Sequence, residues 1–131
     1  MKRYYAIESG APWADADHAD LRGFDWRTKT AEFSICNDKR LMQVSFDDAV
    51  IVRMLDEFPL ATEDGLEDRD GLVPHHFAYR VEGDPFLAAQ SETWREVYGP
   101  LQHYRFITGA GCLDVVANGV PRFAIITSDV R

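Results

Sequence analysis

AEFSIC-NDKR-LMQVSF, residues 31–46, consists of two runs of alternating apolar and polar residues around a short polar turn. The apolar positions fall on one side of each run: Phe33, Ile35, Met42, Val44 and Phe46. Because successive side chains of a strand point to opposite faces, this alternation is typical of half-buried strands. The stretch therefore predicts a β-hairpin, with strands over 31–36 and 41–46.

Outward from the hairpin, several further segments have strand character. Residues 49–55 are apolar and β-branched and predict a third strand, although a helix is the competing interpretation of so short a run. Alternation predicts a fourth strand over 77–82, and residues 104–108 and 122–127 are expected to form a fifth and a sixth. Arg3–Ile7 is compatible with a strand or an ordered arm.

Two short helices are expected in the last third of the chain. The first covers residues 91–98, where Ser91 is the predicted N-cap and Gly99 ends the helix. The second covers Cys112–Asn118, with Gly119 in the position that follows a helix C-cap.

The order of these elements, with strands early and helices late, favours a sheet-rich α+β fold of about six mainly antiparallel strands. Only residues 104–127 have strand–helix–strand order, which allows one parallel pair there. The 131 residues suit a single domain, and 46% of them are hydrophobic, enough for a core. Residues 1–30 are expected to form a mostly irregular arm packed on the body, with a short acidic helical turn at 14–21. Trp13, Phe24 and Trp26 are its predicted aromatic anchors.

The chain is acidic, with a net charge of −8. Binding of nucleic acids and of anionic membranes requires clustered Lys and Arg, so neither partner is expected. A basic protein is the expected partner, because opposite net charge speeds encounter. Met1-Lys2-Arg3 is not followed by the apolar core of a signal peptide, so the predicted compartment is the cytoplasm. Cys36 and Cys112 are expected to be reduced thiols there.

Residues 56–70 hold most of the excess negative charge, with seven acidic residues against one basic residue, Arg69. The acidic residues are Asp56, Glu57, Glu63, Asp64, Glu67, Asp68 and Asp70. Leu60, Leu66 and Leu72 are interspersed and would supply apolar anchors within an acidic rim. Two interpretations stay open: a solvated loop that aids solubility, and a docking surface for a basic partner.

The enzymatic hypothesis rests on Cys112, His103 and Asp114. At the start of a helix, backbone N–H groups would lower the pKa of the Cys112 thiol, and His103 would serve as its base. The competing interpretation is a buried structural thiol, because cysteine is among the most buried residue types.

The sequence predicts no cofactor and no metal. Asp114 stands where a dinucleotide-binding fingerprint that begins at Gly109 needs its third glycine. His75 and His76 are adjacent and would point to opposite faces of a strand. Aligning Gly71 with the sixth position of a calcium loop places Leu66 and Phe77 where oxygen ligands are required.

Four short segments carry a resemblance to other proteins: Gln43–Phe46, Val52–Glu57, His103–Thr108 and Cys112–Val116. Together they resemble a loose group of small, largely uncharacterised bacterial cytosolic proteins. The resemblance implies a compact, sheet-rich α+β domain. Some small acidic proteins of this kind are immunity-like, which means that they neutralise a toxin by covering it.

Two function hypotheses follow. The first is a protein-binding module, immunity-like or regulatory, that docks a basic partner through residues 56–70. The second is a small-molecule-binding domain or minor enzyme, with a pocket near residues 109–112. Self-association through sheet edges or aromatics, giving a homodimer, is compatible with either.

Overall fold

The structure, a computed structural model, describes residues 2–8, 19–35, 40–55, 70–73, 76–84, 99–108 and 111–127. Within these residues there are nine strands and no helix. The strands are β1 (Arg3–Ala6), β2 (Ala19–Asp25), β3 (Thr30–Ile35), β4 (Arg40–Ser45), β5 (Asp48–Leu55), β6 (Ala78–Glu82), β7 (Gln102–Ile107), β8 (Cys112–Asn118) and β9 (Arg122–Thr127).

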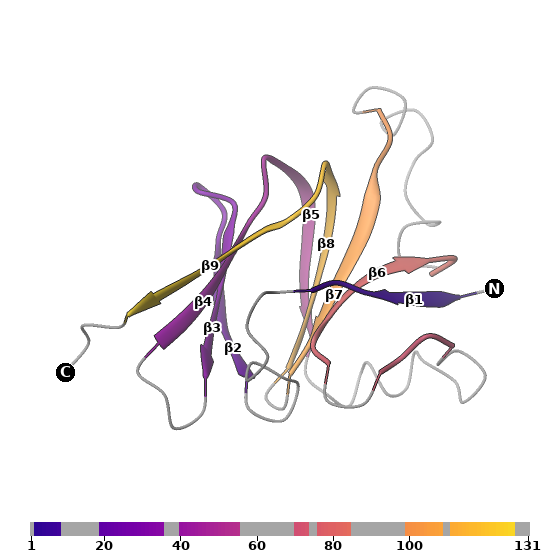
Figure 1. The fold of residues 1–131 in the computed structure, drawn as a ribbon. Coiled ribbons are helices and arrows are strands. Elements are labelled where there is room, and N and C mark those ends of the chain that lie inside the picture. Colours follow the sequence, from indigo (N-terminus) through magenta and orange to yellow (C-terminus); the bar gives the residue numbers. More distant parts are fainter. Residues whose placement is uncertain are drawn as a thin grey trace.

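The strands form two sheets in which every pair of neighbours is antiparallel. Sheet A has the order β1-β6-β7-β8-β5, and sheet B has the order β2-β3-β4-β9. In Figure 1, sheet B lies on the left and sheet A on the right. The described part of the chain is therefore an all-β structure.

The two sheets pack against each other through one apolar core. Phe33 of sheet B contacts Phe106 of sheet A with ring centroids 5.7 Å apart, and Phe77 at 5.3 Å. The fully buried members of this core are Ala31, Phe33, Met42, Val44, Phe46, Phe77, Ala78, Tyr104, Phe106, Leu113, Val115 and Ala117. Within β3, β4, β7 and β8 they come from alternate positions, as expected where one face of each sheet is covered, and Phe46 and Phe77 lie directly beside β4 and β6.

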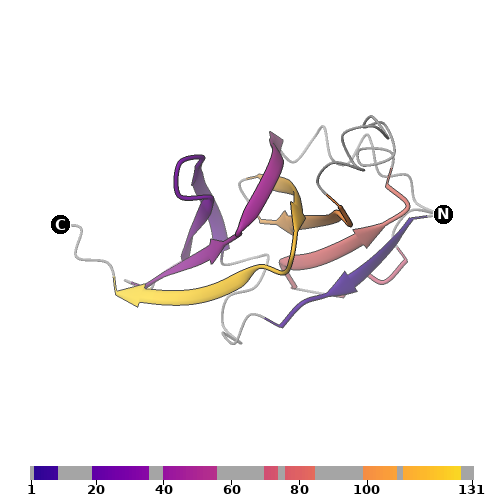
Figure 2. The ribbon, with the colours of Figure 1, turned by 90° about the horizontal axis from the view of Figure 1, so that it is seen from above.

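One corner joins the sheets covalently. The chain passes from β4 to β5 through Phe46–Asp47, and from β8 to β9 through Gly119–Pro121. Because β4 pairs with β9 and β5 pairs with β8, the two connections cross between the sheets together (Figures 1 and 2). Phe46 is buried at this corner, and the Arg122 guanidinium pairs with the Asp47 carboxylate on its surface at 2.6 Å.

The predicted hairpin over 31–46 is confirmed as β3 and β4, in a register that pairs Phe33 with Met42 and Ala31 with Val44. Its turn residues 36–39 lie outside the described residues. The strands predicted over 49–55, 77–82, 104–108 and 122–127 are confirmed as β5, β6, β7 and β9, and Arg3–Ile7 contributes β1. A sheet-rich, mainly antiparallel architecture was therefore predicted correctly.

The helix predicted over Cys112–Asn118 is wrong, because these residues form β8 in the interior of sheet A. Both faces of β8 are buried, so apolar residues occur on both of them and do not alternate with exposed polar ones, and such a segment is ambiguous between strand and helix. Gly119 has φ 95°, but it follows a strand and caps no helix. β7 and β9 belong to different sheets, so the allowed parallel pair is not formed. The helix expected over 91–98 lies outside the described residues.

The arm over residues 1–30, which was predicted to be mostly irregular, contains β1 and β2 where it is described. A bulge between Leu21 and Gly23 shifts the alternation of β2, so that Leu21 and Phe24 both pack against the core. The acidic helical turn expected at 14–21 overlaps this strand, and its first residues, like Trp13, lie outside the described part. Phe24 is an anchor as predicted, whereas Trp26 is 53% exposed.

Candidate functional site

The outer face of sheet A, which points away from the core, contains buried charged side chains. His103 and Arg105 on β7 and Asp114 on β8 are 1%, 0% and 0% exposed. They alternate along their strands with residues of the apolar core, such as Tyr104 and Leu113. Burying a charge is costly unless it is paired and hydrogen-bonded, so the contacts of these groups decide what they do.

Asp114 lies at the centre of this ionic network. The register places Arg105 opposite it on β7 and Arg53 opposite it on β5. Its Oδ1 accepts hydrogen bonds from Arg105 Nε and His103 Nε2, both at 2.7 Å. Its Oδ2 accepts two from Arg53, from Nη2 at 2.8 Å and from Nε at 3.2 Å. Burial alone would raise the pKa of Asp114, but the hydrogen bond from His103 and the charge of Arg105 outweigh it and hold that pKa well below its usual range.

Arg105 extends the network toward β1. Its Nη1 donates to the Tyr4 hydroxyl at 2.8 Å, and its Nη2 lies 3.1 Å from Asp84 Oδ2. The same carboxylate oxygen lies 2.8 Å from Lys2 Nζ. Burial lowers the pKa of Arg105, but the carboxylate of Asp114 more than compensates, so the pKa is raised and the guanidinium stays charged.

The structure brings together only part of the predicted Cys112–His103–Asp114 group. His103 and Asp114 are hydrogen-bonded, in the way that a carboxylate orients a histidine base. His103 is paired with Val116, however, and Cys112 lies four residues away along β8, about 13 Å at strand spacing. Cys112 is buried, and the helix whose dipole would activate it is absent, so His103 does not serve as its base.

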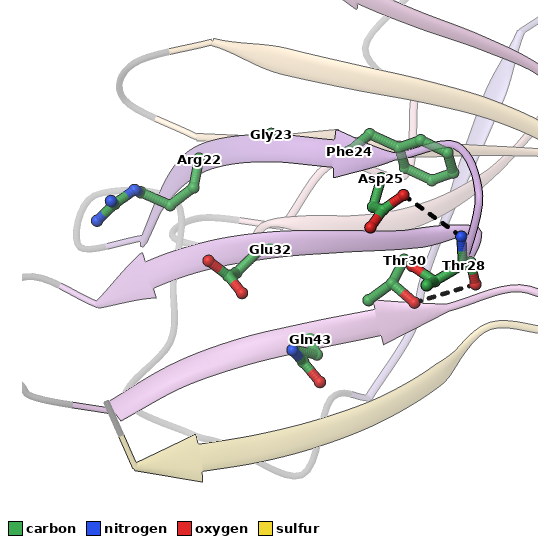
Figure 3. A pocket seen from close by; sticks show the side chains of 8 residues that line it. All are labelled: Arg22, Gly23, Phe24, Asp25, Thr28, Thr30, Glu32 and Gln43. Carbon is green, nitrogen blue, oxygen red and sulfur yellow. Dashed lines mark hydrogen bonds between the residues drawn. The ribbon is translucent and has the colours of Figure 1, made fainter. Parts of the chain in front are cut away.

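The outer face of sheet B is different, because it contains an open hollow of about 400 Å³ across β2, β3 and β4 (Figure 3). Its lining is mostly polar: Arg22, Gly23, Phe24, Asp25, Thr28, Thr30, Glu32 and Gln43. In the register, Glu32 lies between Gly23 on β2 and Gln43 on β4. Glu32 is half-buried and makes no hydrogen bond or ion pair with any described residue.

The local sequence explains why this hollow is open. Gly23 has no side chain, and nothing lies within 4 Å of the position that a Cβ would occupy there. The β2–β3 turn is held by Asp25, whose Oδ1 accepts from the Arg27 N–H at 2.9 Å and the Thr28 N–H at 3.4 Å. In Figure 3, Arg22 extends to the end of the hollow away from this turn. The hollow therefore offers a carboxylate and an amide side by side, with a guanidinium beyond them.

A second hollow, of about 340 Å³, lies where β1 approaches the corner between the sheets. It is lined by Tyr5, Ala6, Ile7, Arg80, Tyr104, Val120 and Pro121. The Arg80 guanidinium covers the Tyr5 ring at 4.3 Å from its centroid. Burial raises the pKa of the Tyr104 hydroxyl, so this group stays a neutral hydrogen-bond donor at physiological pH.

Most of the predicted docking residues lie outside the described part of the chain. The residues outside it are Asp56, Glu57, Glu63, Asp64, Glu67 and Asp68. Asp70 is described and exposed: its carboxylate pairs with Arg3 at 2.7 Å, and its carbonyl accepts the Tyr4 N–H at 2.8 Å. Leu55, which precedes the segment, is the last residue of the edge strand β5 of sheet A. Asp70, at the end of the segment, is hydrogen-bonded to the opposite edge strand, β1.

Neither metal ligands nor membrane spans are found among the described residues. No group of three or more His, Cys, Asp or Glu side chains there is placed to hold a metal ion. Of the adjacent histidines, His75 is outside the described residues, and His76 Nε2 lies 2.7 Å from the Ile7 carbonyl oxygen. The described part also has no helix that is long and apolar enough to cross a membrane.

Several residues of the network and the hollow were not among the predicted site residues. Asp114 was a predicted site residue, but its partner Arg105 was not. Each of the two has apolar residues on both sides in the sequence, which is the signal for a buried ion pair across strands. Glu32, Gly23 and Gln43 had no comparable signal, because their proximity depends on the register of three strands. In comparisons with known proteins, no family model, curated protein or solved structure matches the chain.

Proposed function

We propose that the chain is a cytoplasmic protein-binding module, immunity-like or regulatory, that docks a basic partner through residues 56–70. The observation that supports this proposal is the way in which charge is divided along the chain. A docking surface that attracts a basic partner must carry more negative charge than the rest of the molecule.

The residues described in the structure include ten acidic and ten basic residues, so their formal charge is zero. The remaining residues include twelve acidic and four basic residues, which accounts for the whole net charge of −8. Residues 56–69 alone contribute six acidic residues against Arg69. The negative charge is therefore concentrated in sequence outside the described residues.

The charges of the sheets are also largely neutralised by one another. Ion pairs join Lys2 and Arg105 to Asp84, Arg3 to Asp70, Arg53 and Arg105 to Asp114, Arg80 to Glu82, and Arg122 to Asp47. A basic protein that approaches the molecule is thus attracted mainly by the acidic segment. Asp70 and Leu55 attach the ends of that segment to sheet A.

Two triple variants with the same net charge test the proposal. Glu63→Gln, Asp64→Asn and Asp68→Asn remove three charges from the segment. Glu8→Gln, Asp20→Asn and Asp48→Asn remove three exposed charges from the described residues, where none of them forms an ion pair.

Tagged versions of both variants are used to capture proteins from a cytosolic extract, and each captured protein is then titrated against the purified chain at several salt concentrations. We expect the segment variant to lose a basic partner that the other variant retains, with an affinity that falls as salt rises. Equal capture by the wild type and both variants, or equal loss from both variants, contradicts docking through residues 56–70.

A second candidate function, binding of a small polar ligand, is supported by the hollow on sheet B. Glu32 there is half-buried without an ion pair among the described residues, and Gln43 is beside it. The pocket expected near residues 109–112 lies partly outside the described residues, and the hollow is on the other sheet. Gly23→Leu would fill the hollow, so a ligand found by a thermal-shift screen should bind the wild type and fail to bind this variant.

A further inference from the structure

The four edge strands of the two sheets differ in how they are protected. An edge strand presents unpaired N–H and C=O groups, and proteins normally shield it with charges, bulges, shortness or a covering segment. The edges are β1 and β5 in sheet A, and β2 and β9 in sheet B.

Three of these edges have recognisable protection. β1 is four residues long, and its Tyr4 N–H is bonded to the Asp70 carbonyl at 2.8 Å. β5 has a bulge between Ala49 and Ile51, and bulges twist an edge away from incoming strands. β2 has a bulge as well, together with exposed charged side chains at Asp20, Arg22 and Asp25.

β9 has no bulge, and its one charged residue, Arg122, is at its start. It pairs with β4 over all six residues without a register shift, and β4 is its neighbour in sheet B on one side only. Residues 123–127 (FAIIT) include no charged residue, proline or glycine. Ile125 is 40% exposed, although its partner Met42 is fully buried. Figure 2 shows β9 along the margin of sheet B.

We propose that β9 pairs antiparallel with β9 of a second copy of the chain, which joins two four-stranded B sheets into one continuous sheet. The charge of the strand favours this occupant. Two antiparallel copies of residues 123–127 place no like charges opposite each other, whereas like charges directly opposite are destabilising. A basic partner would find no carboxylate on this strand.

The same pairing covers apolar surface that is now exposed. With the two-fold axis near Ile125, this side chain and its counterpart in the second copy lie on the same face of the joined sheet, as a cross-strand pair. That face is continuous with the core of each copy, because Ile125 is opposite Met42. The backbone bonds and the isoleucine contact thus act together.

This inference is independent of the proposed docking of a basic partner, and the two respond to salt in opposite ways. Each copy has a net charge of −8, so two copies repel each other at long range. Added salt screens this repulsion and should strengthen the β9 pair. The same salt should weaken attraction between the acidic segment and a basic protein.

The test measures the dimer dissociation constant by sedimentation equilibrium over a series of protein and salt concentrations. Ala124→Lys is the main variant, because Ala124 is exposed and lies opposite Gln43 on the outer face, where a lysine leaves the core unchanged. Ile125→Lys is the second variant. Val120→Lys is the matched control, because Val120 is 72% exposed but lies just before β9, outside the strand.

We expect the wild type and Val120→Lys to dimerise equally. The dimer dissociation constants of the β9 variants should be at least about tenfold higher, with unchanged circular dichroism. Amide protection along β9, measured by hydrogen exchange, should rise with protein concentration. A wild type that stays monomeric, a dimer that weakens as salt is added, or a Val120→Lys variant as impaired as Ala124→Lys would overturn the inference.

Discussion

On the outer face of sheet A, acidic and basic side chains are buried and paired, whereas on the outer face of sheet B the same residue types surround an open hollow. Asp114 has an arginine opposite it on each neighbouring strand. Glu32 has Gly23 on one side and Gln43 on the other. The contrast arises from register, because it decides which side chains face a carboxylate across the sheet.

Charged groups on the outer face of sheet A are committed to the fold, whereas those on sheet B are accessible to a ligand. The Asp114 carboxylate accepts four hydrogen bonds from three residues, and these bonds fix how β5, β7 and β8 align. On sheet B, Glu32 forms no hydrogen bond or ion pair in the described part, so its carboxylate can accept hydrogen bonds from outside the chain. Matched substitutions on the two faces test this contrast.

The largest expected effect is that of Asp114→Ala. Removing the carboxylate leaves Arg105 buried beside His103 without its main counter-charge, which should cost about 3–5 kcal/mol of unfolding free energy. Glu32→Ala, on sheet B, should change it by no more than about 0.5 kcal/mol. Urea denaturation of the two variants measures both values. Similar losses would mean that the two faces do not differ as described.

The stability contribution of the Asp114 carboxylate should also depend on pH. The pKa of Asp114 is lower in the folded chain than its unfolded value of about 3.9, so its contribution is complete above roughly pH 5 and is lost as the pH falls below that value. A shift of this kind contributes on the order of 2 kcal/mol. Denaturation from pH 5 to pH 2 should show a shallower loss of stability in Asp114→Asn than in the wild type. Parallel curves would contradict the assignment.

Substitutions of two glycines, one beside each sheet, should change the stability by intermediate amounts. Gly71 beside sheet A has φ 91°, and a Cβ there would lie 2.0 Å from the Tyr4 carbonyl oxygen. Gly71→Ala should therefore cost about 1–3 kcal/mol. Gly23 on sheet B has open space and no left-handed φ, so Gly23→Ala should be neutral or stabilising by up to about 1 kcal/mol. Thermal unfolding of both variants checks the opposite signs.

The smallest expected effect concerns the exposed ion pair of Arg122, on the outer face of sheet B, with Asp47. Its side chains are 58% and 72% exposed, so a double-mutant cycle should give a coupling of about 0.2–1 kcal/mol that fades as salt is added. The cycle of Arg105 with Asp114 on sheet A should give a larger coupling that is insensitive to salt. Equal salt sensitivity in the two cycles would remove the distinction.

The sequence identified much of the framework because most strands have one buried and one solvated face. β3 and β4 alternate clearly, and their pairing followed from the short polar turn. β8 was missed because Cys112, Asp114 and Val116 on its outer face are as buried as the core residues between them. β2 was missed because its bulge and Gly23 interrupt the alternation.

The candidate sites were predictable to a smaller extent. His103 and Asp114 were selected from the sequence, and they are hydrogen-bonded to each other. They belong to an ionic network, however, and His103 does not lie beside Cys112. Arg53, Asp84 and Lys2 come from distant parts of the chain, and no local pattern brings them together. In the sequence, Glu32 and Gln43 are ordinary polar positions of a hairpin. The hollow beside them depends on the register of β2, which pairs Gly23 with Glu32.

The corner between the sheets has a consequence for how the protein is made. Because synthesis runs from the N-terminus, β1 to β7 leave the ribosome before β8 and β9. Until residues 112–127 emerge, β5 has no neighbour, and β4 and β7 each have one. A nascent chain at this stage exposes unpaired strand edges in both sheets at once, and such edges favour aggregation until the last two strands pair with them.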